Sequence, residues 1–273
     1  YDEALYRLGW CYYRLNNYPE AVAYFTLLAD DVHRAKTLDP WHHYTNPALR
    51  DESIEYIGIS FLDHGGVEGA VDYIKSIGGR EYGVEILNKI GDVYKQEKEE
   101  HKKAIETYGL LLKMYPLNEK CPEIQEKIVD CYRLMQDDMM AYMARNELYN
   151  QYRPGSSWWQ KHESEEVREK TASITERALR DNINLLYQRA EEINDRDLYL
   201  QAVDDSRKYL KSFPTDSSAK LIHWNMTLTL DMKLKDNDPA YNEYMKISDI
   251  YWNTKYHKSA AENAIALAKD MVS

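Results

Sequence analysis

A short spacing pattern recurs along the first half of this chain and limits what it can fold into. A small residue is followed three positions later by an aromatic residue, and an alanine comes twelve or thirteen positions after the small one. The small residues are Gly9, Gly58, Gly91 and Val129. Glycine inside a helix costs about 1 kcal/mol relative to alanine, so it is usually found where another part of the chain comes close. The recurrence predicts helical hairpins in which the second helix crosses the first at the small residue and presents the alanine to it.

This pattern resembles the tetratricopeptide repeat (TPR) family, in which W-x2-L-G-x2-Y is followed by A-x3-F and P with a period of about 34 residues. The first copy runs from Leu8-Gly9 through Tyr12 and Ala21 to Phe25. The resemblance covers residues 1–154 and implies an all-α, right-handed TPR-type α-solenoid of stacked helical hairpins. We expect four TPR-like hairpins in residues 1–154.

The spacing of the copies is uneven. The small residues lie 49, 33 and 38 positions apart, so the first interval holds about fifteen residues beyond one repeat. They include the stretch 39–47, which two prolines mark as a loop. Residues 41–44 of this loop are Trp-His-His-Tyr. A packed or solvent-exposed loop is a better interpretation of this histidine pair than a metal site, because adjacent loop histidines cannot be assumed to chelate one ion.

The second half differs in composition, because no glycine follows Gly155. Ser157 and Gln160 fit a helix-capping box, and apolar residues then recur every three or four positions as far as Asp195. We therefore expect mainly one long connecting helix over 157–195, bent near Ser164 or Ser173. A degenerate fifth repeat should follow, and then three helices that begin near residues 216, 238 and 256. Residues 155–273 would thus continue the same solenoid, with about a dozen helices in the whole chain.

Composition narrows the class of function. The net charge is −11, and an acidic surface repels phosphate backbones, so nucleic acid is not an expected partner. No run approaches the roughly 18 apolar residues of a membrane helix. The chain begins in mid-pattern at Tyr1, which indicates an excised piece whose targeting signal would lie elsewhere. Cys11, Cys121 and Cys131 form no CxxC motif, and the shared repeat position of Cys11 and Cys131 predicts small buried packing residues.

No motif for phosphate binding, metal binding or nucleophilic catalysis is present, so we expect no enzyme activity, no cofactor and no metal. Trp158 and Trp159 could form a ligand platform, although packing of the long helix is the simpler interpretation. The remaining candidate for function is a binding surface. Solenoids commonly bind along the concave side lined by their first helices.

The resemblance to the TPR family implies that the outward-facing residues of the first helices contact the ligand. These positions are Glu3, Tyr6, Trp10, Tyr13, Arg14, Glu52, Glu55, Ile59, Leu62, Asp63, Glu85, Asn88, Asp92, Lys95, Gln96, Glu123, Glu126, Asp130, Arg133 and Leu134. Of these, we predict that eleven bind the partner: Tyr6, Trp10, Tyr13, Arg14, Glu55, Asn88, Asp92, Lys95, Glu126, Asp130 and Arg133.

The charge of these twenty positions suggests a type of partner. Nine are acidic and three are basic, a net of −6. Chaperone-binding members of the family hold a terminal carboxylate with basic residues and asparagine, and the acidic positions here disfavour that function. A basic, partly apolar peptide or helix fits better, with Tyr6, Trp10 and Tyr13 as aromatic anchors.

Three functions remain open. The leading one is a non-enzymatic scaffold that recruits a protein or peptide into a larger assembly. The second is a structural subunit that self-assembles or packs on flanking repeats through an apolar end at Leu5, Leu8 and Tyr12. The third is a helical enzyme with two facing carboxylates in a deep pocket. The run 4–21 is also similar to bacterial envelope TPR proteins, relatives of the β-barrel assembly lipoprotein and of gliding-motility accessory proteins, which implies a periplasmic or envelope-associated location.

Overall fold

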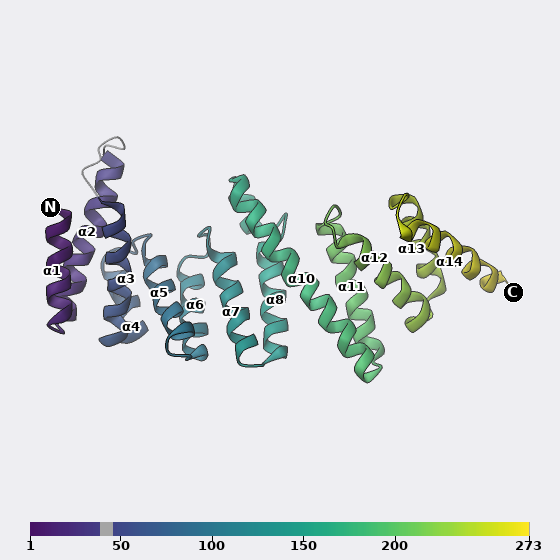
Figure 1. The fold of residues 1–273 in the computed structure, drawn as a ribbon, viewed down its shortest axis with the longest axis horizontal. Coiled ribbons are helices and arrows are strands. Elements are labelled where there is room, and N and C mark those ends of the chain that lie inside the picture. Colours follow the sequence, from purple (N-terminus) through teal and green to yellow (C-terminus); the bar gives the residue numbers. More distant parts are fainter. Residues whose placement is uncertain (39–45, 273) are drawn as a thin grey trace. The chain divides into compact units, whose positions relative to one another are not determined.

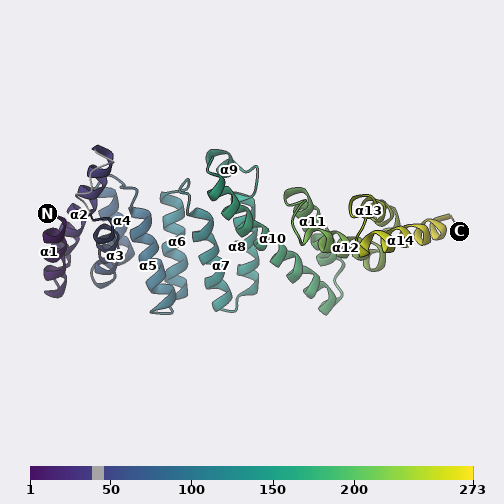
Figure 2. The same ribbon diagram turned by 45° about the horizontal axis from the view of Figure 1, so that its top comes forward.

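The computed structural model describes residues 1–38 and 46–272, and these form helices, turns and connecting segments without a β-strand. The chain divides into two compact units, Tyr1–Ala141 and Tyr142–Ser273. Within each unit the helices lie next to one another in chain order (Figures 1 and 2). The prediction of an all-α chain of stacked helical hairpins is confirmed for the described residues.

The first unit contains three complete hairpins and the first helix of a fourth. Each pair packs within itself, and each later first helix also packs on the second helix of the hairpin before it. The helices are α1 (Asp2–Arg14), α2 (Tyr18–Leu38), α3 (Pro47–Asp63), α4 (Gly66–Ser76), α5 (Gly83–Gln96), α6 (His101–Met114) and α7 (Cys121–Leu134). The recurring small residues therefore all lie in first helices, as the pattern predicts.

The boundary between the units falls inside α8 (Asp138–Tyr152). Two buried hydrophobic clusters of the second unit include Leu179, Tyr209 and Phe213 in one and Tyr199, Met226 and Tyr244 in the other. Its helices are α9 (Ser157–Lys161), α10 (Glu165–Ile193), α11 (Arg196–Ser212), α12 (Ala219–Leu228), the π-helix η1 (Thr229–Leu234), α13 (Asn237–Ile250) and α14 (Lys255–Val272).

The glycines have a different role from the expected one. A Cβ atom added to Gly9 would lie 2.6 Å from Phe25 Cε1, and one added to Gly91 would lie 2.7 Å from Tyr108 Cδ1. Each glycine thus makes room for an aromatic ring of its own hairpin, rather than for close approach of two backbones at an alanine. Gly58 faces no such ring, and the atom nearest to a Cβ added there would be the carbonyl oxygen of Ile86 in α5, at 3.2 Å.

The long connecting helix is shorter than expected because it begins after a break. The segment from Ser157 divides into α9 and the 29-residue α10. His162 lies in the break, where its ring stacks on Trp158 at 3.8 Å and its Nδ1 lies 2.8 Å from the Trp158 carbonyl oxygen. Ser164 then caps α10 by accepting a hydrogen bond from Val167 N–H. The expected cap at Ser157 is also wrong by one residue, because Ser156 caps α9.

The cysteines are free, and one of them differs from expectation. Cys121 and Cys131 are buried, but Cys11 is exposed. In α3, α5 and α7 the equivalent positions are covered, since the second helix of the preceding hairpin packs on each of these helices. Among the described helices, α1 has no such predecessor, so Cys11 faces solvent.

Candidate functional site

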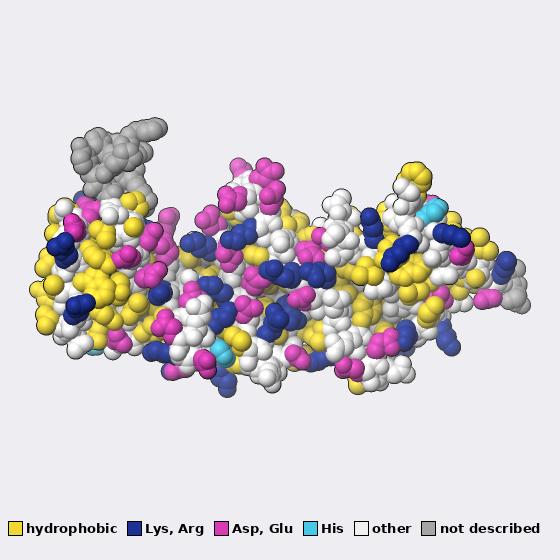
Figure 3. All heavy atoms as spheres, viewed as in Figure 1, with side chains coloured by type: hydrophobic (Ala, Val, Ile, Leu, Met, Phe, Trp, Pro, Cys, Tyr) yellow, Lys and Arg dark blue, Asp and Glu magenta, His cyan; other side chains and the backbone are white. Residues whose placement is uncertain are grey.

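The candidate site is the surface formed by α1, α3, α5 and α7 of the first unit, here called the first-helix face. Hydrophobic side chains gather over α1 and α3, whereas charged side chains of both signs cover α5 and α7 (Figure 3). This division separates the predicted site into an aromatic part and a charged part.

The aromatic part is a cluster of four half-buried rings, Tyr6, Trp10, Tyr13 and Tyr56. The Trp10 ring centroid lies 4.4 Å from that of Tyr56, 5.8 Å from Tyr13 and 6.4 Å from Tyr6. The fully buried Phe25 contacts Tyr6 and Tyr56, with centroids at 6.2 and 5.7 Å. Space for Phe25 depends on Gly9, so the repeat pattern itself supports this aromatic cluster from below.

Two hydroxyl groups of the cluster fix its rings to α3. Tyr6 donates a hydrogen bond to Glu52, and Tyr13 donates one to Asp63 at 3.3 Å. Burial raises the pKa of Tyr6 and of Tyr13, and the neighbouring carboxylates raise each pKa further. Both hydroxyls therefore stay protonated at neutral pH and remain donors.

The charged part is a series of ion pairs that link neighbouring first helices. Between α3 and α5, Arg50 pairs with Glu85 at 3.2 Å and Lys89 pairs with Glu55 at 3.0 Å. These contacts join the first helices of successive repeats. They explain why charge accumulates on this face without a ligand.

The same arrangement continues between α5 and α7. Lys127 pairs with Asp92 at 2.6 Å and also donates to Asn88 at 2.8 Å, while Lys95 pairs with Asp130 at 2.9 Å. Predicted site residues are thus brought together in pairs. These partly buried ion pairs tie α5 to α7.

The bases of the inter-repeat ion pairs make the net charge of this face less negative than the sequence prediction. Arg50, Lys89 and Lys127 were absent from the predicted set, yet each contacts one of its acids. Including them changes nine acids and three bases into nine acids and six bases, so the net charge is −3 rather than −6. Sequence register alone could have suggested Lys89 and Lys127, which lie one position from Asn88 and Glu126.

The remaining predicted residues lie at the edges. The Arg14 guanidinium carbon lies 5.5 Å from the Trp10 ring centroid, and Arg133 lies 4.0 Å from Asp130. Glu126 is half-buried and has interactions of its own. Tyr56, which the sequence set also lacks, contacts Trp10, Tyr13 and Phe25 in the aromatic cluster. Its place beside Ile57 in the repeat gave no signal of these contacts.

A separate apolar stripe runs along α1 and the two residues that flank it. Tyr1, Leu8 and Leu15 are 80%, 41% and 73% exposed, and their seven-residue spacing places them on one side of the helix. Leu5, expected at this exposed end, is instead buried against Leu28 and Val32. The loop residues 41–44, including the histidine pair, lie outside the described residues.

Other site classes receive no support from the described part of the chain. No group of three or more His, Cys, Asp or Glu side chains there is placed to hold a metal ion. Within the same residues, no helix combines the length and apolarity needed to span a membrane.

Comparison with known families tests the repeat assignment. The model of the tetratricopeptide repeat matches residues 3–32. Residues 3–32 form a tetratricopeptide repeat. This TPR comprises most of α1 and the greater part of α2, and it supplies Tyr6, Trp10 and Tyr13 to the aromatic cluster.

Wider comparisons give only distant likenesses. No curated protein matches the chain. Among solved structures, the apo form of RapI is similar over 99% of this chain and 71% of its own, with 12% identity and a TM-score of 0.40. PilF of Pseudomonas aeruginosa is similar over 96% of this chain and 97% of its own, with 12% identity and a TM-score of 0.34. A tetratricopeptide repeat protein from Parabacteroides merdae is similar over 97% of this chain and 98% of its own, with 16% identity and a TM-score of 0.28. At these scores the likenesses say nothing of function.

Proposed function

We propose that this chain is a non-enzymatic TPR scaffold whose first-helix face binds a protein or peptide segment. The observation that carries the proposal is the aromatic cluster. Trp10 and its three tyrosine neighbours are half-buried rings held in fixed positions by Phe25, Glu52 and Asp63. Rigid aromatic side chains that leave part of their surface open are typical anchors of protein interfaces.

The charges suggest how a partner would be chosen. Four of the nine acids of the face pair with a base of a neighbouring repeat, so a broad attraction for cations is weaker than the sequence count implies. Glu52 and Asp63 differ, because each accepts a hydrogen bond from a tyrosine hydroxyl and so lies beside the cluster. A segment with an apolar anchor and an adjacent basic residue fits this arrangement.

The setting of the assembly is a further part of the proposal. Envelope association is supported by the likeness of the sequence around residues 4–21 to envelope TPR proteins. The acidic face also makes nucleic acid a poor partner, as phosphate would meet carboxylates along the first helices.

The test is to select peptides from a displayed library on the whole chain and to measure their affinity for variants. Trp10→Ala should weaken binding by about 2 kcal/mol, or roughly 30-fold in Kd, because it removes the centre of the aromatic cluster. Trp252→Ala is the matched control, as Trp252 is 72% exposed in the second unit. Circular dichroism must show that both variants remain folded. Equal affinity of the two variants would contradict the proposal.

The apolar stripe on α1 favours a second candidate function, a structural subunit that self-assembles or packs on flanking repeats. If the stripe formed such a contact, Leu8→Glu would reduce the concentration-dependent association seen by sedimentation. Leu221→Glu is its control, because Leu221 is similarly exposed, at 50%, on α12 of the second unit. Association that survives Leu8→Glu would exclude this route.

A further inference from the structure

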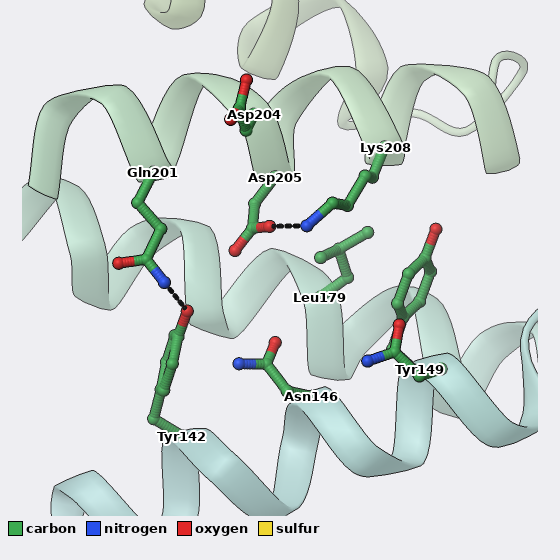
Figure 4. Close-up of a pocket in the computed structure, with 9 residues that line it drawn as sticks. Tyr142, Asn146, Tyr149, Leu179, Gln201, Asp204, Asp205 and Lys208 are labelled. Atoms are coloured by element: carbon green, nitrogen blue, oxygen red, sulfur yellow. Dashed lines mark hydrogen bonds and ion pairs between the residues drawn. The ribbon is translucent and has the colours of Figure 1, made fainter. Parts of the chain in front are cut away.

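The second unit contains a polar pocket that neither the repeat pattern nor the first-helix face uses. Its volume is about 230 Å³, and it lies between α8, α10 and α11 (Figure 4). Tyr142, Asn146 and Tyr149 line it from α8, Leu179 lines it from α10, and Asp205 with Lys208 lines it from α11. All of these residues belong to the same compact unit.

Asp205 is the unusual member of this pocket. It is only 3% exposed, and its Oδ1 accepts a hydrogen bond from Lys208 Nζ at 2.7 Å. Its Oδ2 is buried and has no hydrogen-bond partner. In Figure 4 this carboxylate lies between α11 and the facing residues of α8. A buried carboxylate oxygen without a donor is unfavourable, so the pocket presents an acceptor that lacks a donor.

The charges favour a cation over an anion. Asp204 and Asp205 outnumber the single base Lys208 among the lining residues. A divalent metal fits poorly, since the Lys208 ammonium occupies one oxygen of Asp205 and no cluster of three or more His, Cys, Asp or Glu ligands exists among the described residues. A group that brings several N–H donors is therefore the better occupant.

The opposite wall offers a second acceptor and flat surfaces. Asn146 Oδ1 accepts from Asn182 Nδ2 at 3.0 Å, and a carbonyl oxygen can accept a second hydrogen bond. The Tyr142 ring stands on the same wall, fixed where its hydroxyl accepts from Gln201 Nε2 at 2.6 Å. A planar cation could then donate to Asp205 and Asn146 while its face lies along a tyrosine ring.

We propose that this pocket binds the guanidinium group of an arginine side chain from a protein partner. Guanidinium has five N–H donors in a rigid plane and is weakly hydrated, which suits acceptors on two different helices. The volume lies below the roughly 300–1,000 Å³ of pockets for whole small molecules, so a single side chain is the appropriate size. The site is separate from the first-helix face, and its test does not depend on the function proposed there.

The experiment titrates the whole chain with N-acetyl-arginine amide and follows the side-chain amide signals of Asn146 and Gln201 by NMR. N-acetyl-citrulline amide has nearly the same shape without the charge, and N-acetyl-lysine amide has the charge without the planar fork. Saturable shifts with the arginine compound, and binding at least tenfold weaker for the other two, are expected.

Two carboxylate-to-amide variants on α11 test whether arginine binds at this pocket or is attracted by the acidic surface in general. Asp205→Asn should weaken arginine binding at least tenfold. Asp197→Asn should leave it within twofold, because Asp197 is exposed on the same helix and does not line the pocket. Lys208→Met should strengthen binding by removing the competing ammonium, which keeps the test decisive if Asp205→Asn fails to fold. Equal shifts with arginine and citrulline, or no shifts with any compound, would overturn the proposal and leave a pocket filled by water alone.

Discussion

At the scale of single residues, the repeat pattern records which side chains need space. Gly9 faces Phe25 and Gly91 faces Tyr108, each aromatic lying four residues after the repeat alanine. In the other two copies this position holds Ile74 and Arg145. In these copies no aromatic ring has to fit against the small residue, so a glycine is not needed there. This explains how Val129 can take the glycine position in the fourth copy.

Substitution at Gly91 should show this requirement. A Cβ at this position overlaps the buried Tyr108 ring, whose hydroxyl is held by Asp92 at 2.6 Å and which therefore cannot easily move. Overpacking costs about 1–3 kcal/mol, so Gly91→Ala should lower the free energy of unfolding even though alanine favours helix. Chemical denaturation followed by circular dichroism measures the change.

Gly109 provides the control within the same hairpin. It lies on the exposed side of α6, and nothing is within 4 Å of an added Cβ. Gly109→Ala should stabilise the protein by up to about 1 kcal/mol. Combining Gly91→Ala with Tyr108→Leu should cost less than the sum of the single changes; additive effects would show that the ring and the glycine do not share this space.

The cysteines give a second prediction at this scale. Cys11 is exposed, whereas Cys121 and Cys131 are buried, and burial raises the pKa of the Cys131 thiol to about 11. A small thiol reagent should therefore modify one cysteine per folded chain and three after denaturation. Mass spectrometry of the labelled peptides should place the first label on Cys11, and rapid labelling of Cys131 would contradict the structure.

At the scale of helices, sequence periodicity predicts which segments are helical better than where they end. The stripe from Ile174 to Ile193 identified the main part of α10, and a bend was expected near Ser164 or Ser173, but periodicity did not show that the chain breaks into two helices at residues 162–164. That break depends on the tertiary position of Trp158, which is buried and stacks on His162. Likewise, the repeat placed Trp10 and Tyr13 on the first-helix face, while Tyr56 and the pairing bases became visible only when neighbouring repeats were in contact.

A buried pair between α12 and α13 should make stability depend on pH. Burial opposes ionisation of Glu243, but hydrogen bonds from His223 and Lys246 outweigh it and lower the pKa of Glu243 from 4.5 to about 2. A lowered folded-state pKa adds stability above pH 4.5 that is lost as the pH falls from 4.5 towards 2. The shift corresponds to a contribution on the order of 3 kcal/mol near neutral pH.

The comparison with Glu243→Gln isolates this contribution. The variant should have a lower free energy of unfolding at pH 7, and the difference from the native chain should shrink as the pH approaches 2. Glu262→Gln should change little at either pH, because Glu262 is exposed and lies 3.7 Å from Lys258 on the same helix. A difference for Glu243→Gln that is constant from pH 7 to pH 2 would rule out the linkage.

At the scale of the whole molecule, stability should be distributed along the chain rather than concentrated in one core. Each hairpin of the first unit packs on its neighbours in sequence, and the second unit has its own hydrophobic clusters. In repeat arrays stability is approximately a sum over repeats and their nearest-neighbour interfaces. We propose that the regular repeats end at residue 154. The boundary at Ala141 separates two compact units and does not locate the end of the regular repeats.

Hydrogen exchange on the variant Gly91→Val should reveal this distribution. The added side chain overlaps Tyr108, so protection should fall first in α5 and α6, and then in α7, which packs on α6. Helices α13 and α14 pack on each other, and α13 packs on α12 and η1, so they make these contacts without α5. Their exchange should match that of the native chain. An equal rise in exchange in α5 and in α14 would mean that the chain opens as one cooperative unit, and the effect of a substitution could not then be assigned to its own hairpin.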